Sequence, residues 1–119
     1  MIKKKNICIL GLGYVGLPLA VAFAEKYHVF GFDISSTRIE ELNDGHDITL
    51  EIEDNLLASV RNNITYTTNI QDTKDCDIYI VTVPTPIDKA NCPDLTPLIE
   101  SSKIIGTVLN KKDIVIYES

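Results

Sequence analysis

The sequence predicts an α/β fold, a doubly wound parallel sheet with helices on both faces. Three observations favour this fold class. Short apolar runs alternate with longer segments of helical periodicity along the chain. A glycine pattern, GxGxxG at residues 11–16, stands between the first apolar run and the first helical segment. An acid, Asp33, closes the second apolar run. Together these features are typical of a Rossmann-type fold.

The first predicted strand and helix flank the glycine pattern. Residues 6–10 are apolar and bounded by lysine and glycine, as expected for a strand buried on both faces of a parallel sheet. Residues 14–26 are rich in leucine and alanine and too long for one strand, which predicts a helix. Residues 28–33 are again apolar and give the second strand.

A second helix follows the second strand. Thr37 and Glu40 have the spacing of a capping box, and Gly45 after Asn43-Asp44 supplies a stop signal. Within residues 46–63 the apolar residues share one helical face, which favours a further short helix.

The second half of the chain predicts three more strands and one helix. Residues 64–67 and 77–83 are rich in β-forming residues. The last helix starts at Thr96, which we expect to be its N-cap, with Pro97 at the first helical position. Residues 114–117 form the fifth strand. Right-handed crossovers between parallel strands then predict the order 3-2-1-4-5.

Length and charge limit the classes of function. With 119 residues the chain is about one domain, short for a complete enzyme with two substrates, so we expect residues 1–119 to be one domain of a longer protein. Hydrophobic residues make up 45% and charged residues 24%, which indicates a folded core rather than a disordered tail. The net charge of −6 repels a phosphate backbone, so nucleic acid is not an expected partner.

The cysteines and the uncharged N-terminal stretch bear on location. Cys8, Cys76 and Cys92 are odd in number and widely spaced, which fits neither a disulfide framework nor a zinc site and suits a reducing cytoplasm. Lysines before the uncharged residues 7–24 resemble a signal peptide, but glycines and a proline interrupt that stretch where a strand, turn and helix require them. We therefore expect no membrane segment and no metal site.

Each glycine of the pattern has a physical role in the expected strand-turn-helix unit. Gly11 permits the tight turn, Gly13 leaves room for a pyrophosphate, and Gly16 lets the helix approach the sheet. The unpaired amides and the dipole at the helix N-terminus favour an anion there without any lysine. The alternative is a purely structural glycine turn.

Asp33 supports a dinucleotide, because it follows the glycines by about 20 residues at the end of the second strand. Its carboxylate is suited to accept hydrogen bonds from the adenosine ribose hydroxyls and to repel the extra phosphate of NADP, so NAD is the predicted cofactor. Arg38 leaves two alternatives open. Its guanidinium either neutralises a 2′-phosphate or is simply a solvated helix residue.

The fourth strand is followed by Val83-Pro84-Thr85-Pro86, at the edge where open α/β sheets bind ligands. Thr85 is a candidate cofactor contact, although an ordinary proline-rich connection explains the loop equally well. Glu118 and Ser119 end the fifth strand on the same edge. Neither Cys8, inside an apolar strand, nor Cys76, between two aspartates, is expected to be a nucleophile. Cys92 lies in a loop and is reactive only if exposed, but nothing nearby offers it a base.

Three motifs carry a resemblance to a known family. Residues 11–18, GLGYVGLP, the residues GFD at 31–33 and the VPTP loop at 83–86 together resemble the UDP-glucose/GDP-mannose dehydrogenase family. The resemblance spans essentially the whole chain. It implies that the pyrophosphate is held by Gly11, Gly13, Tyr14, Val15 and Gly16. It also implies that Asp33 and Arg38 lie at the adenosine ribose, and that Val83, Pro84, Thr85 and Glu118 lie on the nicotinamide side.

The resemblance also implies an activity for the whole protein. The family oxidises the sugar C6 alcohol to a carboxylate with two NAD, through a cysteine that this sequence does not contain, and the full-length protein is expected to be a homodimer. Asp88 with residues 93–97 is most similar to members acting on UDP-N-acetylhexosamines for surface or capsular polysaccharide. This fragment alone is expected to be inactive. The alternatives are an NAD-sensing module without chemistry and an S-adenosylmethionine-dependent methyltransferase.

Overall fold

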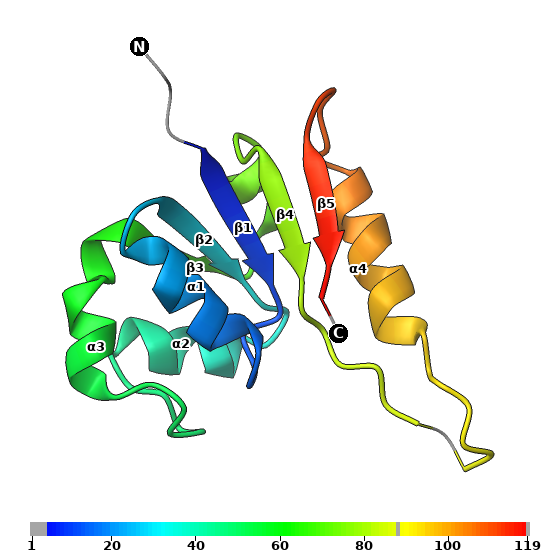
Figure 1. Cartoon of the computed structure of the whole chain (residues 1–119), viewed down its shortest axis with the longest axis horizontal. Helices are drawn as coiled ribbons and strands as arrows, with labels where there is room; N and C mark the ends of the chain where they lie inside the picture. Colours follow the sequence, from blue (N-terminus) through cyan, green and yellow to red (C-terminus); the bar gives the residue numbers. More distant parts are fainter. Residues whose placement is uncertain (1–4, 88, 119) are drawn as a thin grey trace.

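A computed structural model describes residues 5–87 and 89–118 of the chain. Five parallel strands form one sheet in the order β3-β2-β1-β4-β5, which confirms the predicted fold class and strand order (Figure 1). The strands are β1 Asn6–Leu10, β2 His28–Phe32, β3 Ile64–Thr67, β4 Ile78–Val81 and β5 Ile114–Tyr117.

Helices cover both faces of the sheet. The helices are α1 Gly16–Ala24, α2 Ser36–Asn43, α3 Asp54–Ser59 and α4 Thr96–Gly106, with short 3-10 turns at Arg61–Asn63 and Ile70–Thr73. Side chains of α1, α2 and α3 pack together on one face of β1 and β2, whereas α4 packs on the other face beside β4. This is the doubly wound arrangement.

The central strand explains how the core is divided. Ile7 and Ile9 of β1 belong to the core under α1, while Cys8 and Leu10 belong to the core under α4. All four are almost fully buried. Because neighbouring residues of a strand point to opposite faces, β1 holds both layers together. The prediction of a strand buried on both faces is confirmed.

The helix expected over residues 14–26 is shorter at both ends. Proline has no N–H, so Pro18 cannot donate to the carbonyl of Tyr14, and the regular helix begins at Gly16. At the other end the amides of Lys26 and Tyr27 both donate to the Phe23 carbonyl, which closes the last turn.

Both predicted helix caps are wrong. The N-cap of α2 is Ser35, whose hydroxyl accepts from the Arg38 amide at 3.2 Å, rather than Thr37. Thr96 is already the first residue of α4, and its amide donates to the Asp94 carboxylate at 3.0 Å. In each case an oxygen-bearing side chain slightly earlier in the chain is better placed to accept. Gly45, with φ of 86°, lies just past the end of α2 as predicted.

In the part of the chain that the structure describes, no helix has both the length and the apolar character needed to cross a bilayer.

Candidate functional site

The carboxyl ends of all five parallel strands lie at one edge of the sheet, and candidate site residues follow four of them, β1, β2, β4 and β5. Backbone hydrogen bonds extend the pairing one residue past the strands: the Gly11 amide donates to Phe32 at 2.9 Å, Thr82 to Leu10 at 2.9 Å, and Glu118 to Val81 at 2.8 Å. This edge therefore brings together the glycine loop, Asp33 and the residues that follow β4 and β5. These are the segments in which the sequence placed its candidate site.

The glycine loop has the geometry that its three glycines predict. Gly11 has φ of 91°, a left-handed conformation that L side chains rarely adopt. A Cβ at Gly16 would overlap the carbonyl of Gly11 and the hydroxyl of Thr82, so only glycine allows α1 to come this close. A Cβ at Gly13 would meet no atom within 4 Å, which leaves open space beside the loop.

The open space lies at the N-terminus of α1. Leu17 and Leu19 donate to the carbonyls of Gly13 and Val15, but within the described residues the amides of Gly13–Gly16 donate no hydrogen bond. Gly13, Tyr14 and Val15 are exposed, whereas Gly16 is buried. A cluster of unpaired N–H groups at the positive end of a helix fits a diphosphate.

Asp33 holds the start of the glycine loop by a hydrogen bond, and its carboxylate can still accept hydrogen bonds from a ligand. One carboxylate oxygen accepts from the Leu12 amide at 2.9 Å and the other from the Ser35 amide at 2.9 Å. Because a carboxylate oxygen can accept two hydrogen bonds, each oxygen retains one free position. The side chain is half-buried at the sheet edge, where a ribose hydroxyl can reach it.

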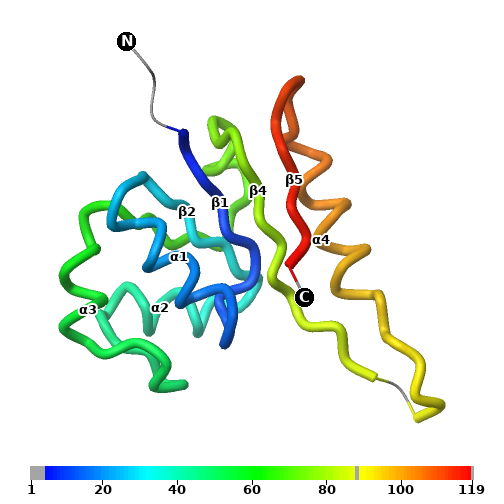
Figure 2. Tube along the Cα trace, in the orientation of Figure 1, coloured from blue at the N-terminus to red at the C-terminus, as the bar shows by residue number. Residues whose placement is uncertain are grey.

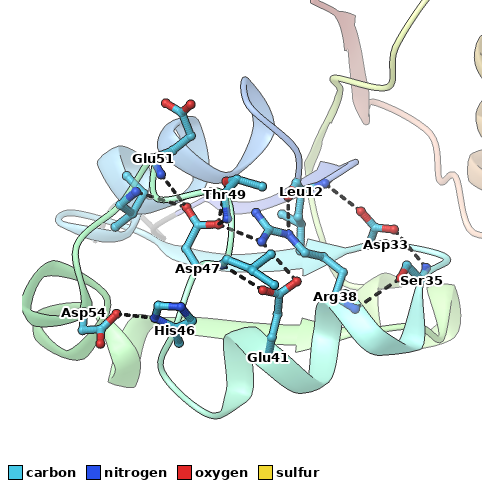
Figure 3. A network of polar contacts seen from close by, with 12 residues as sticks. Leu12, Asp33, Ser35, Arg38, Glu41, His46, Asp47, Thr49, Glu51 and Asp54 are labelled. Atoms are coloured by element: carbon cyan, nitrogen blue, oxygen red, sulfur yellow. Dashed lines mark hydrogen bonds and ion pairs between the residues drawn. The ribbon is translucent and has the colours of Figure 1, made fainter.

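Arg38 is buried and supports the glycine loop from inside the protein. It is 9% exposed, so its interpretation as a solvated helix residue is wrong. Its Nε donates to the Leu12 carbonyl at 2.7 Å, and its Nη1 lies 2.8 Å from Asp47 and 3.3 Å from Glu41 (Figure 3). Burial alone would lower the pKa of Arg38, but the hydrogen bonds to Asp47 and Glu41 raise it above its ordinary value. The guanidinium is therefore a permanent charge inside the protein.

Asp47 is a site residue that sequence reasoning missed. Its side chain is fully buried and accepts from the amides of Thr49, Glu51 and Ile52 as well as from Arg38. Burial alone would raise the pKa of Asp47, but hydrogen bonds from the Thr49 hydroxyl, at 2.6 Å, from Arg38 and from the amides of Ile52 and Thr49 lower it to about 2. In the sequence Asp47 stands in a polar stretch after Gly45 and resembles an ordinary surface turn. Only the tertiary contact with Arg38 distinguishes it.

Thr82 is a second residue that the sequence did not single out. Its hydroxyl lies 2.6 Å from the Gly11 carbonyl and 3.0 Å from the Leu10 carbonyl, and it donates between them. It therefore joins the end of β4 to the glycine loop. A threonine at the end of an apolar strand carries no sequence signal for this role.

The proline loop after β4, residues 83–86, is half-buried or exposed. Val83 packs on the core under α4, Pro84 is exposed, and Thr85 is half-buried without a side-chain hydrogen bond among the described residues. The loop then leaves the sheet and returns to α4 (Figure 2), where the Asp94 amide donates to Pro86 at 2.6 Å. Asp88 and Ser119, which the resemblance also implicated, lie outside the described residues.

The buried cysteines have no nucleophilic character. Burial raises the pKa of Cys76 to about 12, with further contributions from Asp77 and Asp75. Burial also raises the pKa of Cys8. The prediction that neither is a nucleophile therefore has a physical basis, and burial is the larger cause for both. Over residues 5–87 and 89–118 no cluster of His, Cys, Asp or Glu has the arrangement of a metal site.

Comparison with known proteins agrees with these features. Residues 5–119 match the UDP-glucose/GDP-mannose dehydrogenase family, NAD binding domain. A UDP-N-acetyl-D-glucosamine 6-dehydrogenase of Pseudomonas aeruginosa is 53% identical over 117 residues, which are 98% of this chain and 28% of the relative. One of the same name from Salmonella typhi is 51% identical over 118 residues, 99% of this chain and 28% of the relative.

A solved structure gives the same result in three dimensions. The UDP-D-ManNAc dehydrogenase of Pyrococcus horikoshii superimposes with a TM-score of 0.88 and 37% identity, covering 96% of this chain and 28% of that one. The chain thus spans 28% of the length of each of these three proteins.

Proposed function

The chain belongs to the UDP-glucose/GDP-mannose dehydrogenase family as its NAD-binding domain, and from this premise we propose that it is the cofactor half of a nucleotide-sugar 6-dehydrogenase. The full-length protein would oxidise the C6 alcohol of a UDP-sugar to the carboxylate. UDP-N-acetylglucosamine or UDP-N-acetylgalactosamine is the proposed substrate, with UDP-glucose the next candidate. Two relatives named as UDP-N-acetyl-D-glucosamine 6-dehydrogenases support the first of these.

The observation that carries the proposal is the glycine loop with its unpaired amides beside an acceptor carboxylate. The amides of Gly13, Tyr14, Val15 and Gly16 would hold the pyrophosphate, because they donate no hydrogen bond among the described residues and stand at a helix N-terminus, beside the open space at Gly13. Asp33 would accept from the adenosine ribose hydroxyls with the positions that Leu12 and Ser35 leave free. Its negative charge beside the ribose disfavours a 2′-phosphate.

The nicotinamide side is proposed for the residues that follow β4 and β5. Val83, Pro84 and Thr85 lie past the end of β4, and Glu118 lies beside them past the end of β5. This side contributes fewer polar groups than the adenosine side. When bound, NAD supplies the hydride acceptor, and the role of this chain is to fix its orientation.

The proposed reaction needs more than this domain. Conversion of an alcohol to a carboxylate removes four electrons as two hydrides, which reduce two NAD, while one water supplies the second oxygen. A covalent cysteine intermediate fits this sequence of steps, but Cys8 and Cys76 are buried with raised pKa. Cys92 is exposed, in a loop for which the sequence predicts no neighbouring base. We therefore place the nucleophile in another part of the full-length protein and expect the 119-residue chain alone to be inactive. We also propose that the full-length protein is a homodimer.

The test uses the full-length natural protein that carries this sequence. NADH formed per UDP-N-acetylglucosamine, UDP-N-acetylgalactosamine, UDP-glucose or GDP-mannose is counted. About two NADH per sugar on one of them supports the dehydrogenase and identifies its substrate. NAD binding that Asp33→Ala abolishes, without turnover of any sugar, would instead support the NAD-sensing module.

A further inference from the structure

We propose that the segment joining α2 to α3 carries a docking surface for the substrate-binding part of the full-length protein. The surface consists of Ile48 and Leu50, the apolar tip, which are 70% and 78% exposed. Large apolar side chains that gather in one exposed place mark interaction sites. The inference rests on the proposed function, because it assumes that the remainder of a longer enzyme binds the sugar nucleotide.

The segment that carries the apolar tip is held firmly from beneath. The buried Asp47 carboxylate accepts from three backbone amides of this segment. The Ile48 amide donates to the Glu41 carboxylate at 2.9 Å, and the Leu50 amide donates to the Asp47 carbonyl at 3.0 Å. The backbone under both exposed side chains is therefore fixed, and a partner that covers them does not incur the cost of ordering it.

The backbone of Leu50 is strained. Its φ of 58° lies in the left-handed region, in which asparagine is enriched and leucine is rare. Glycine or asparagine would adopt this conformation more easily and would leave no aliphatic group in water. Leu50 therefore costs folding free energy through its backbone and through its exposed side chain. Residues held in such conformations cluster at functional sites, and a partner that buries the side chain would offset part of this cost.

The apolar tip belongs to the edge of the sheet that carries the candidate cofactor site. In Figure 1 the segment joining α2 to α3 reaches the side to which the strand arrows point, and the glycine loop lies on the same side. Two contacts connect them: Asp47 pairs with Arg38 at 2.8 Å, and Arg38 donates to the Leu12 carbonyl at 2.7 Å (Figure 3). A sugar that gives its hydride to a cofactor bound here must be held over this edge. The part of the protein that holds the sugar therefore approaches the domain from the side of the tip.

Acidic residues around the apolar tip identify the chemistry of its partner. Residues 40–54 contain seven acidic residues and neither lysine nor arginine. Two of the seven pair with Arg38, whereas Glu51 and Glu53 are exposed on the same segment as the tip. A second copy of this domain would bring the same charges and be repelled, whereas an apolar socket rimmed by lysine or arginine complements them. The size of the remainder agrees, because this chain spans 28% of its two named relatives and their other residues form a larger body.

Photo-crosslinking in the full-length natural protein tests the contact directly. p-Benzoylphenylalanine in place of Leu50 is irradiated with NAD and UDP-N-acetylglucosamine present, and mass spectrometry identifies the crosslinked peptides. We expect crosslinks to a peptide beyond residue 119 that carries lysine or arginine. The same label in place of Leu109 is the matched control, because Leu109 is 44% exposed but precedes β5, at the opposite edge of the sheet. It is expected to give no crosslink to that peptide.

A second variant separates docking from folding. Leu50→Asn suits the left-handed backbone, so the free energy of unfolding should not fall, but it removes the aliphatic group from the contact. We expect the KM of the sugar nucleotide that the protein oxidises to rise about tenfold, the value of burying one leucine side chain. The Kd of NAD should change less than about twofold. Leu109→Asn is the control and should change neither constant.

Three outcomes overturn the inference. A crosslink from position 50 to residues 1–119 of another copy would make the tip a contact between copies of this domain. A crosslink yield no higher than that of the Leu109 control would leave the tip in solvent. An unchanged KM in Leu50→Asn would mean that the tip contributes nothing to substrate binding. Failure of the proposed function is a separate observation, in which the wild-type protein forms no NADH from any of the four sugar nucleotides.

Discussion

The β1–β2 part and the β4–β5 part of the carboxyl edge differ in how many hydrogen bonds hold their site residues in place. Beside β1 and β2, the amide and carbonyl of Leu12 are both held, by Asp33 and Arg38, and Arg38 is held by the buried Asp47. Beside β4 and β5, the Thr85 hydroxyl makes no hydrogen bond among the described residues, and Pro84 and Glu118 are exposed. The side proposed for the adenosine half of NAD is thus preorganised by its own contacts, whereas the side proposed for the nicotinamide is open.

From this difference we expect most of the free energy of NAD binding by this chain to come from contacts near β1 and β2. A preformed set of donors and acceptors binds without the cost of ordering them, whereas an unbraced loop incurs that cost on binding. Substitutions near β1 and β2 should therefore have large effects, and those near β4 and β5 small ones.

The largest expected effect is at Gly16. In Gly16→Ala the new Cβ collides with the backbone of Gly11 and with Thr82, so we expect a loss of about 3 kcal/mol in the free energy of unfolding, together with loss of NAD binding. Urea unfolding followed by circular dichroism measures the first.

Gly13→Ala is the matched control. Its Cβ would meet no atom within 4 Å, so the free energy of unfolding should change by less than about 0.5 kcal/mol while NAD affinity still falls. A Gly13→Ala variant that binds NAD normally would contradict the placement of the pyrophosphate beside this glycine.

Asp33→Ala should have the next largest effect. It removes the acceptor for the Leu12 and Ser35 amides and for the proposed ribose hydroxyls. We expect NAD affinity to fall roughly 10- to 100-fold, the value of hydrogen bonds to a charged group. Fluorescence titration with NAD and with nicotinamide mononucleotide sharpens the comparison, because only the ligand with the adenosine half should lose affinity.

The buried carboxylate predicts an acid-dependent loss of stability. The folded-state pKa of Asp47 is about 2, below its ordinary value of 3.8, so its contribution is fully present above about pH 4 and is lost as pH falls toward 2. We expect this contribution to be about 2 kcal/mol. Chemical unfolding between pH 5 and pH 2 measures the slope, which should be shallower in Asp47→Asn.

Thr85→Ala should have the smallest effect. The hydroxyl is uncommitted, so NAD affinity of the 119-residue chain should change by less than about threefold. A larger loss in this short chain would break the comparison, because it would show that the β4–β5 side already makes an ordered contact with the cofactor.

The sequence was sufficient for the fold because the relevant signals are local. The apolar run at β1 and the glycines of residues 11–16 each specify their backbone without reference to distant residues. Helix ends were less predictable, since Ser35 competes with Thr37 for the same cap and only geometry decides between them. The start of α1 at Gly16 could have been predicted from the sequence, because Pro18 has no N–H to donate.

The supporting residues of the site were beyond prediction. Asp33 is marked by its spacing from the glycines, but Asp47 and Thr82 act through partners far away in the chain. Arg38 shows the same limit, because its charge suggested either solvent or a phosphate and only the fold pairs it with Asp47. Burial of paired charges is a tertiary property, and one sequence carries no sign of it.

The central position of β1 has a consequence for synthesis on the ribosome. β1 leaves the ribosome before the other four strands of this sheet, and β2 then pairs with one edge of it while β3 pairs with β2. Its other edge stays unpaired until Val81 of β4 has been made. During that interval the nascent chain exposes an apolar strand edge, the kind of surface that recruits chaperones or aggregates. The exposure lasts from the synthesis of Leu10, the last residue of β1, to that of its partner Val81.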